Sequence, residues 1–229
     1  MALSSNPVIV AENASKLFLD GAVVAFRQLS FAINRNEIMC IVGPSGCGKT
    51  TFLRCIAGLT DISSGQLEVD GKPVVGPPDG VAMVFQHFGL LPWKTVYENA
   101  AFGLAMAGAA PAKIKDRVGH YLELVGLAGF EKHYPYQLSG GMQQRVGLAR
   151  AIAADPEIIF FDEPTTGLDP IMADVINDLI VACVRKQGIT ALSITHDMHS
   201  ARKIADRVCM LHQGRLIWTG PSSAVDSSG

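Results

Sequence analysis

The stretch from Gly43 to Thr50 limits what this chain can fold into, because it fits the phosphate-binding pattern G-x-x-x-x-G-K-[ST] at every fixed position. Residues 37–42 before it have the pattern of a short buried strand, and residues 51–57 after it that of an amphipathic helix closed by Gly58. In such a setting the backbone N–H groups of the loop converge on phosphate oxygens, and the helix N-terminus adds a favourable dipole. A glycine turn that binds nothing is the alternative, but it leaves the placed lysine and threonine unexplained. The motif therefore predicts a bound nucleotide.

The phosphate loop supplies the first candidate binding residues. Lys49 is expected to bridge the outer phosphates, and the hydroxyl of Thr50 to ligate Mg²⁺. Cys47 lies inside the loop and is expected to be a small filler, where alkylation would block the nucleotide by its bulk. The complete set expected to contact the nucleotide here is Gly43, Pro44, Ser45, Gly46, Cys47, Gly48, Lys49, Thr50 and Thr51.

Length and composition narrow the class of protein. A chain of 229 residues is long enough for one large domain or a domain with a subdomain. No run approaches the roughly 18 apolar residues of a membrane span, and residues 1–18 lack the pattern of a secretory signal. Five scattered cysteines without disulfide or zinc spacing fit a reducing cytosol. A net charge of −2 argues against nucleic-acid binding by bulk electrostatics, so we expect a soluble cytosolic protein without a nucleic-acid partner.

Hydrophobic periodicity divides the chain into strand-rich ends and a helix-rich middle. Strands are expected over 8–10, 23–26, 29–33, 65–72 (with a tight turn), 81–85, 158–161 and 190–195, with Phe18 on the loop between the first two. Helices are expected over 96–106 with Thr95 as N-cap, from Pro111 to Val125, from Ser139 to Ile152, from Pro170 to Gly188, and over 200–206. A hairpin is expected over 208–218.

A second half of the site is predicted where the buried strand 158–161 runs into Asp162 and Glu163. A strand delivers its last side chains to its carboxyl-terminal edge, where the Asp162 carboxylate can hold Mg²⁺ directly or through water. Glu163 is then placed to accept a proton from, or to orient, the water that attacks the γ-phosphate. The alternative is that this acidic pair only caps a helix.

The stretch from Leu138 to Arg145 resembles the signature motif of ATP-binding cassette (ABC) proteins, and it lies just before the acidic strand, as that family requires. Met142 stands where the motif usually has glutamine. The resemblance covers about Val8 to Gly220. It implies an ATPase with an α/β fold of the P-loop NTPase class, in which an ABC-type core carries an N-terminal antiparallel β-subdomain and an inserted helical signature subdomain. We expect one domain over 1–229, divided into a core at 1–89 and 154–221, a helical subdomain at 90–153 and a flexible tail at 222–229.

The resemblance also implies roles for residues outside the phosphate loop. Gln86 resembles the glutamine of the family's Q-loop, with catalytic and Mg²⁺-contacting roles. His196 resembles the switch histidine that contacts the γ-phosphate. Gly167-Leu168-Asp169 resembles the D-loop, which places Asp169 at the nucleotide. Phe18 resembles the aromatic residue that stacks on adenine, although a core or surface aromatic would show the same pattern.

The signature residues Ser139, Gly140 and Gly141 form a small-residue turn at a helix N-terminus, where backbone N–H groups can cradle an anion. Lys49 already serves the one triphosphate of a single chain, so a second anion-binding helix start suggests action on a partner's nucleotide. The family works in this way: two domains meet head-to-tail in an isologous pair, and each ATP lies between one phosphate loop and the other domain's signature. ATP then stabilises the closed homodimer only while its γ-phosphate remains.

Of the uses that ABC ATPases make of ATP, membrane transport fits this chain best. The chain has no heptad run like that of the DNA-organising relatives, one cassette where ribosome-acting relatives have two, and no Asn-Lys-x-Asp motif of a GTPase. We expect a peripheral subunit on the cytoplasmic face of the plasma membrane. Integral permease subunits are expected to dock at residues 86–99, where several large apolar residues gather, with a solute-binding protein as an indirect partner.

Different parts of the sequence resemble ATPases of transporters for different solutes. Leu91-Pro92-Trp93 and residues 134–142 resemble importers of nitrate, sulfonates and taurine, with betaine importers close by, which implies a small anionic or zwitterionic solute. Residues 162–174 instead resemble the ATPases of phospholipid-trafficking (Mla-type) systems. A soluble regulatory ABC ATPase without a membrane partner is a further alternative. A nucleotide-binding module without catalysis is disfavoured by the presence of a candidate base, Q-loop glutamine and switch histidine.

Overall fold

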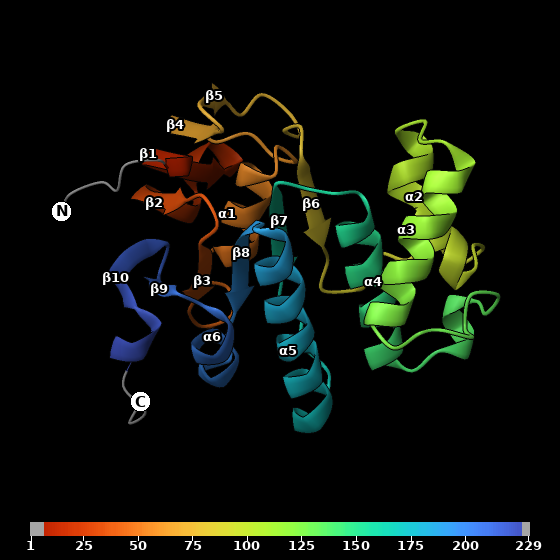
Figure 1. Cartoon of the computed structure of the whole chain (residues 1–229). Helices are drawn as coiled ribbons and strands as arrows, with labels where there is room; N and C mark the ends of the chain where they lie inside the picture. Colours follow the sequence, from red (N-terminus) through yellow and green to blue (C-terminus); the bar gives the residue numbers. More distant parts are fainter. Residues whose placement is uncertain (1–6, 226–229) are drawn as a thin grey trace.

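The computed structural model describes residues 7–225 and arranges them as two β-sheets with one helix between them and further helices outside (Figure 1). The strands are β1 (Pro7–Phe18), β2 (Val23–Asn34), β3 (Ile38–Val42), β4 (Ser64–Val69), β5 (Lys72–Pro73), β6 (Val81–Val84), β7 (Ile158–Asp162), β8 (Thr190–Thr195), β9 (Arg207–His212) and β10 (Arg215–Pro221). The α-helices are α1 (Lys49–Ile56), α2 (Val96–Met106), α3 (Pro111–Leu124), α4 (Gly140–Ala153), α5 (Pro170–Gln187) and α6 (Met198–Ile204). Short 3₁₀ helices are η1 (Leu19–Gly21), η2 (Pro135–Gln137) and η3 (Ser222–Ala224).

The larger sheet has the strand order β10-β9-β3-β8-β7-β6. Its strands run parallel except β10, which pairs antiparallel with β9. Every residue of β3, β7 and β8 is buried, because α1 covers one face of this sheet and α5 and α6 cover the other. Strands covered on both faces need no polar side, which is why β3 and residues 158–161 of β7 are continuous apolar runs in the sequence, whereas β8 also buries the hydroxyls of Thr190, Ser193 and Thr195.

The smaller sheet is antiparallel, with the order β2-β1-β4-β5. Helix α1 lies between the two sheets, in contact with β2 and β4 on one side and with β7 and β8 on the other. The ring of Phe52 on α1 meets the rings of Phe26 and Phe31 edge-on, at centroid distances of 5.0 and 5.2 Å. The helix that begins in the phosphate loop is therefore held from two sides by one apolar core.

Helices α2, α3 and α4 pack together beyond the β6 edge of the larger sheet (Figure 1). The predicted N-cap of α2 is confirmed: the Thr95 hydroxyl accepts from the amide of Glu98 at 3.2 Å, and the Glu98 carboxylate accepts from the amide of Thr95 at 2.8 Å. These helices share buried residues with α5. The division into a core and a helical subdomain over residues 90–153 stays a prediction.

The N-terminal strands differ from the expected ones. Strand β1 runs to Phe18, so this residue ends a strand and does not lie on a loop. The strands expected over 23–26 and 29–33 form one strand, β2, although Gln28 inside it has a φ of 53°. The amide of Gln28 donates to the hydroxyl of Ser15 on β1 at 3.0 Å. This bond satisfies the amide of the irregular residue, so β1 and β2 stay paired on both sides of it, as at a β-bulge.

Two expected segments near the C-terminus also differ. The helix predicted over 200–206 is α6, which ends at Ile204. Asp206 lies beyond it, where its carboxylate accepts from the amide of Ile38 on β3 at 2.8 Å. The tail predicted to be flexible begins with η3, and Val225 packs against the apolar cluster beside α6. Residues 226–229 of that tail lie outside the described residues.

Parallel pairing brings the carboxyl ends of β3, β8, β7 and β6 to one edge of the larger sheet. In register, Val42 lies opposite Thr195, and Asp162 lies opposite Ile194. The phosphate loop follows β3, Glu163 follows β7 and the candidate switch histidine follows β8. The fold therefore gathers three separate predicted segments at one place.

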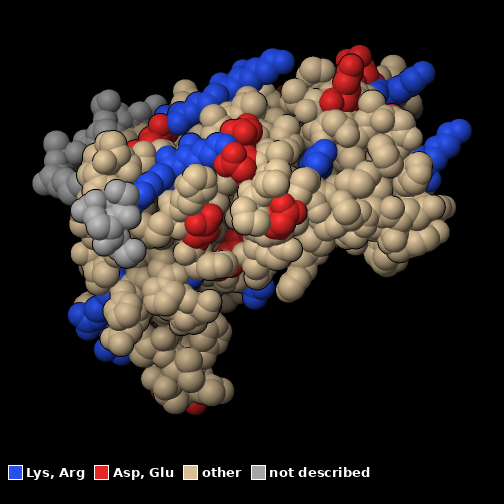
Figure 2. Space-filling view, turned by 90° about the horizontal axis from the view of Figure 1, so that it is seen from below, with Lys and Arg blue, Asp and Glu red and all other residues tan. Residues whose placement is uncertain are grey.

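Two surface properties bear on possible partners. Within residues 7–225, no helix combines the length and the apolar composition that crossing a bilayer requires. Figure 2 shows basic and acidic side chains interspersed over one face of the molecule, without a continuous field of one sign. This distribution agrees with the net charge of −2.

Candidate active site

The phosphate loop connects the end of β3 to the start of α1. Gly48 precedes α1 with a φ of 104°, and no side chain caps the helix there. The first amides of α1 lack partners within the helix, so they are available to an anion. A Cβ at Gly48 would overlap the carbonyl oxygen of Ala25 on β2, and one at Gly43 would overlap that of Leu211 on β9. Close packing of the loop against two strands therefore requires glycine at both positions.

Lys49 is buried, and its amine donates to the carbonyl oxygens of Gly43 at 2.7 Å and Pro44 at 3.1 Å. Because these partners belong to the loop itself, the ammonium lies inside the curl where phosphate oxygens are expected. Its Nζ also lies 3.8 Å from Oε1 of Glu163. The loop thus keeps a positive charge in place at the predicted phosphate position.

The remaining predicted loop residues differ in their exposure. Pro44, Ser45 and Gly46 are exposed and form the outer rim of the loop. Cys47 is buried, which fits the predicted role of a small filler, and Thr51 is half-buried in the first turn of α1.

Thr50 and Asp162 bring two oxygen ligands together. The hydroxyl of Thr50 donates to Oδ1 of Asp162 at 3.1 Å. Burial raises the pKa of the Asp162 carboxyl, and the hydrogen bond from Thr50 opposes that shift. A hydroxyl and a carboxylate in contact beside a phosphate site suit Mg²⁺, which uses one or two protein oxygens and completes its shell with water and phosphate oxygens. The donor set therefore fits the predicted cofactor.

Glu163 leaves β7 through an uncommon backbone conformation for a residue with a side chain, with a φ of 49°. Its amide donates to the carbonyl of Ile194 on β8 at 3.0 Å. The carboxylate is thereby turned toward β8, where Oε2 accepts from the hydroxyl of Thr166 at 2.8 Å and lies 3.0 Å from Nδ1 of His196. An ammonium, a hydroxyl and an imidazole from different segments thus surround one carboxylate.

This arrangement suits the attack of water on a phosphoryl group. The Glu163 side chain is 12% exposed, so a water molecule can reach a carboxylate that its neighbours hold in place. The His196 side chain is 52% exposed and can contact a group bound over the loop. Lys49 can bind phosphate oxygens on the other side of the same carboxylate. The catalytic roles of Glu163 and His196 stay predictions.

Gln86 lies just beyond β6, half-buried, at the same edge of the sheet. The segment after it is held by a residue that the sequence did not indicate. Arg150 on α4 donates to the carbonyls of Phe88 at 3.0 Å and Gly89 at 2.6 Å, and both of these residues have left-handed backbones, with φ of 57° and 54°. Gly147 lets α4 come close, since a Cβ there would lie 3.5 Å from the Phe88 carbonyl oxygen. Helix α4 therefore positions the segment that carries the predicted Q-loop glutamine.

The signature residues have neighbours other than the phosphate loop. Ser139 and Gly140 are exposed, and the Ser139 hydroxyl caps α4. A Cβ at Gly140 would meet the ring of Phe88 at 3.7 Å and the side chain of Leu168 at 3.8 Å, while Gly141 is buried. Helix α4 packs against α2, α3, α5 and β6, whereas α1 packs against β2, β4, β7 and β8. The two helix starts predicted to bind anions are thus built on different elements.

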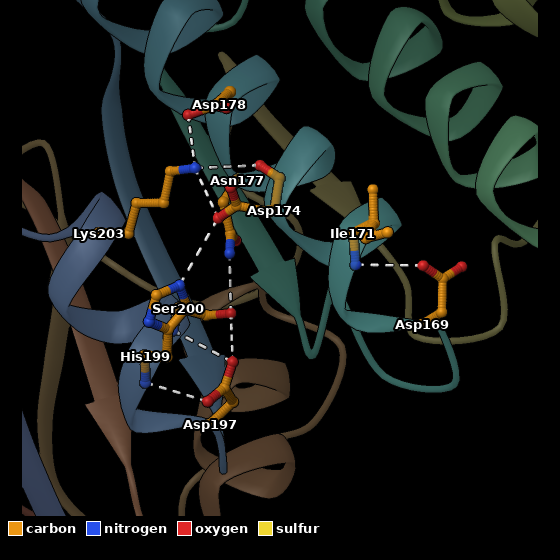
Figure 3. A network of polar contacts seen from close by, with 9 residues as sticks. All are labelled: Asp169, Ile171, Asp174, Asn177, Asp178, Asp197, His199, Ser200 and Lys203. Atoms are coloured by element: carbon orange, nitrogen blue, oxygen red, sulfur yellow. Dashed lines mark hydrogen bonds and ion pairs between the residues drawn. The ribbon is translucent and has the colours of Figure 1, made fainter.

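Asp169, the predicted D-loop contact, is engaged within its own helix. Its Oδ1 accepts from the amide of Ile171 at 3.1 Å (Figure 3). It also accepts from the amide of Met172 at 3.0 Å, so that Asp169 caps α5. Among the described contacts, none joins this carboxylate to Lys49 or Glu163. A contact of Asp169 with a nucleotide stays a prediction.

Phe18, the predicted adenine-stacking residue, is 40% exposed, and the amine of Lys16 lies 4.9 Å from the centre of its ring. Phe18 pairs with Val23 on β2, close to Ala25, whose carbonyl abuts the phosphate loop. The ring is therefore available to stack on a base bound near the loop, and that role stays a prediction.

Thr166 is the residue beside the candidate base that sequence reasoning missed. Its hydroxyl donates to Glu163, which lies three positions earlier in the sequence. A threonine in a turn is a weak signal, because serine and threonine are frequent in turns for local reasons. Only the fold shows that this hydroxyl holds the carboxylate.

Residues 26–166 match the family described as ABC transporter. The methionine import ATP-binding protein MetN of Caulobacter vibrioides is 41% identical over 223 residues, which cover 93% of this chain and 67% of that protein. The Fe(3+) ions import ATP-binding protein FbpC of Pasteurella multocida is 39% identical over 223 residues, which cover 96% of this chain and 63% of that protein. MetN of Geobacillus kaustophilus is 41% identical over 223 residues, which cover 93% of this chain and 65% of that protein. The chain therefore spans about two thirds of the length of these relatives.

Solved structures share the fold. The cbiO1 protein of Clostridium perfringens, part of the ABC transporter complex cbiONQ, aligns with a TM-score of 0.88 at 28% identity and covers 96% of this chain and 91% of that one. A dimeric ATP-binding cassette in a post-hydrolysis state bound to ADP and Pi aligns with a TM-score of 0.84 at 30% identity, covering 93% and 98%. These alignments confirm the predicted fold class.

Proposed function

Because the chain belongs to the ABC transporter family and has the fold of an ABC ATPase, we propose that it hydrolyses ATP as the energy-supplying subunit of a membrane importer. ATP is the nucleotide of this family. One observation carries the proposal for this chain: Lys49, Thr166 and His196 converge on the carboxylate of Glu163 at the sheet edge.

The proposed chemistry is the attack of water on the γ-phosphate of ATP. The ammonium of Lys49 exchanges its contacts with loop carbonyls for phosphate oxygens, and the loop amides bind alongside it. Mg²⁺ held through Thr50 and Asp162 would neutralise charge on the phosphates. Glu163 orients the attacking water and takes its proton, and His196 contacts the γ-phosphate. Gln86 follows β6 at the same edge and is proposed to join this group when the site closes.

The proposed working unit is a pair of chains arranged head-to-tail. The exposed signature start at Ser139 and Gly140 is built on elements that do not contact α1 closely, which supports its use on another copy's nucleotide. A related cassette bound to ADP and Pi is dimeric. In the proposed pair, residues 139–141 of one copy complete the site around Lys49 of the other. ATP favours the closed pair because it contacts both copies at once.

An exposed aromatic surface supports docking of integral permease subunits. Trp93, Tyr134 and Tyr136 are 70%, 37% and 78% exposed, and the two tyrosine rings stack at 5.8 Å between centroids. Backbone hydrogen bonds join the start of α2 to residues 131–133, which brings the tryptophan and tyrosine segments side by side. Large exposed aromatics of this kind mark binding surfaces.

Burial supports a smaller docking surface than the segment predicted over residues 86–99. Val96 and Asn99 are fully buried, so they belong to the protein's own core. The proposed docking surface therefore consists of Trp93 with Tyr134 and Tyr136. Docking there would hold the chain at the cytoplasmic face of the plasma membrane, and a solute-binding protein would act through the permease.

The transported solute is proposed from resemblance. Relatives named for import of methionine and of Fe(3+) ions support the direction of transport. Residues 91–93 and 134–142 favour a small anionic or zwitterionic solute of the nitrate, sulfonate, taurine or betaine type. Residues 162–174 favour a second candidate, an Mla-type phospholipid-trafficking system. The ATPase does not contact the cargo, so the permease partner decides between them.

Affinity purification from detergent-solubilised membranes of the native host tests the proposal. The tagged chain should hydrolyse ATP and bring integral membrane proteins with it, and sequencing of those proteins identifies the transporter class. A variant with both Trp93→Ala and Tyr136→Ala should lose these partners and keep ATP binding. An unaltered chain that is recovered alone would favour a soluble regulatory ATPase.

A further inference from the structure

His196 lies on the turn between β8 and α6, so its placement depends on how that turn is held. The amide of Asp197 donates to the hydroxyl of Thr195 at 3.0 Å. The Asp197 carboxylate caps α6 by accepting from the amides of His199 at 3.0 Å and Ser200 at 3.1 Å. Both residues that flank His196 are thus fixed by side-chain hydrogen bonds.

A side chain from α5 reaches this cap. The hydroxyl of Ser200 donates to Oδ2 of Asp197 at 2.6 Å and accepts from Nδ2 of Asn177 at 2.9 Å (Figure 3). A hydroxyl carries one hydrogen, and Asp197 takes it, so the atom of Asn177 that faces Ser200 must be the amide nitrogen. The hydrogen bonds therefore run in one direction, from α5 to the cap beside His196.

The hydrogen bond to Ser200 is the one described contact of the Asn177 side-chain amide within residues 7–225. The residue is 1% exposed, and its Oδ1 has no hydrogen-bond partner among the described residues. The other buried residues of α5 are apolar, namely Ile176, Ile180, Cys183 and Val184. Burying an unpaired amide oxygen is unfavourable, and a leucine of similar size would avoid it. Asparagine at this position is therefore explained by the bond that its nitrogen donates to Ser200.

Ion pairs between α5 and α6 lie at the surface, while Val181 of α5 packs against the buried cluster that includes Ala201 and Ile204 of α6. Lys203 forms ion pairs with Asp174 at 2.6 Å and Asp178 at 2.8 Å, and Nε2 of His199 lies 3.6 Å from Asp174 (Figure 3). The two aspartate side chains are 47% and 67% exposed, so these pairs contribute little. Neither Asp174 nor Asp178 forms a hydrogen bond to Asp197 or His196 among the described contacts.

We propose that Asn177 and Ser200 are positioning residues for His196: through Asp197 they fix the turn that holds the imidazole beside the carboxylate of Glu163. The inference rests on the proposed function, because it assigns the effect to ATP hydrolysis. Helix α5 begins at the D-loop, so this buried bond also connects the D-loop helix to the switch histidine.

Steady-state ATP hydrolysis by Asn177→Leu tests the proposal. Leucine removes the donor and the unpaired oxygen together, so the unfolding temperature should stay within about 3 °C of that of the unaltered chain. We expect kcat to fall about tenfold with KM for ATP unchanged, because displacing a reacting group slows the chemical step without weakening binding. Ser200→Ala interrupts the same hydrogen bonds and should give the same fall in kcat, although it leaves the buried Asn177 amide without an acceptor and should lower the unfolding temperature further. If Asn177→Leu fails to fold, the kcat of Ser200→Ala tests the proposal in its place.

Two comparisons separate positioning from general packing. Lys203→Gln removes surface ion pairs between the same helices and should leave kcat unchanged. In a His196→Ala background, Asn177→Leu should cause no further loss, because the imidazole that it positions is gone. Unchanged kcat in Asn177→Leu, or an equal loss in both backgrounds, overturns the proposal.

Nitrogen NMR of the imidazole, recorded without nucleotide, tests the placement independently of turnover. The Nδ1 resonance of His196 should shift in Asn177→Leu and Ser200→Ala and stay in place in Lys203→Gln. An Nδ1 resonance that is unchanged in the first two variants overturns the inference. If these shifts occur in a chain that hydrolyses no ATP, the placement stands and the proposed function fails.

Discussion

Oε2 of Glu163 and Nδ1 of His196 lie 3.0 Å apart, although 33 positions in the sequence separate them. The contact exists because β7 and β8 are neighbouring parallel strands that end at the same edge of the sheet. Glu163 leaves β7 with a left-handed backbone, which turns its carboxylate toward β8. The pair places a candidate base and a second polar group around one phosphate position.

Replacing Glu163 with glutamine keeps the shape of the side chain and removes the charge that can accept a proton. We expect ATP affinity within about threefold of the unaltered chain and a kcat lower by about 10²–10⁴-fold. Direct titration measures binding, and phosphate release measures turnover. Turnover close to that of the unaltered chain would show that Glu163 is not the base.

Lys49→Ala removes the buried ammonium from the phosphate loop. We expect ATP affinity to fall about 100-fold, which corresponds to about 3 kcal/mol for a lost charge-assisted contact. Titration calorimetry measures the affinity for ATP. Lys72→Ala, which changes an exposed lysine on β5, is the matched control. If Lys49→Ala binds ATP as tightly as the control does, the phosphate-loop assignment is wrong.

Gly48→Ala and Gly46→Ala separate close packing from backbone strain. The two glycines have φ of 104° and 80°, so an alanine at either position is strained by about 1–3 kcal/mol. A Cβ at Gly48 also overlaps the carbonyl of Ala25, whereas no atom lies within 4 Å at Gly46. Denaturant titration should show a larger loss of unfolding free energy for Gly48→Ala. Equal losses would contradict the packing of the loop against β2.

All five cysteines are buried, so their position in the fold should decide which of them an alkylating reagent reaches first. Burial raises the pKa of the Cys55, Cys183 and Cys209 thiols to about 11. Their thiolate fraction is therefore roughly 10⁻³ at pH 8 and rises about tenfold with each pH unit up to that value. N-Ethylmaleimide at pH 8 should first modify Cys47, which lies on the phosphate loop, and should block ATP binding. Bound ATP should slow the modification of Cys47, and the Cys47→Ser variant should keep its ATP binding after treatment with the reagent. If the reagent inactivates Cys47→Ser as fast as the unaltered chain, the prediction is wrong.

Local signals made part of the fold predictable. Signals from neighbouring residues predicted the apolar strands β3 and β7, the strand β8, the cap at Thr95 and the helix between Pro170 and Gly188, and the structure confirms them. The continuous strand β2 was not predictable, because the irregular Gln28 is accommodated by the hydroxyl of Ser15, 13 positions away on another strand. Contacts between strands override the turn signal in the local sequence.

The candidate site was likewise predictable only in part. Motifs identified Thr50 and Asp162, and the structure brings their side chains into contact. The contacts of Thr166, Arg150 and Asn177 depend on which strands and helices become neighbours, so no motif indicates them. Sequence patterns thus found the groups expected to meet the nucleotide, and the fold was needed to find the groups that hold them.

The central claim is that ATP closes two copies of this chain on each other, with residues 139–141 of one completing the site of its partner. Sedimentation of Glu163→Gln with Mg²⁺ and either ATP or ADP tests it most directly, because this variant should bind ATP without consuming it. We predict a dimer with ATP and no increase in dimer with ADP. Adding Ser139→Arg should abolish that dimer while each monomer keeps its bound ATP. A monomer at saturating ATP, or loss of ATP binding by the Ser139→Arg monomer, would contradict the account.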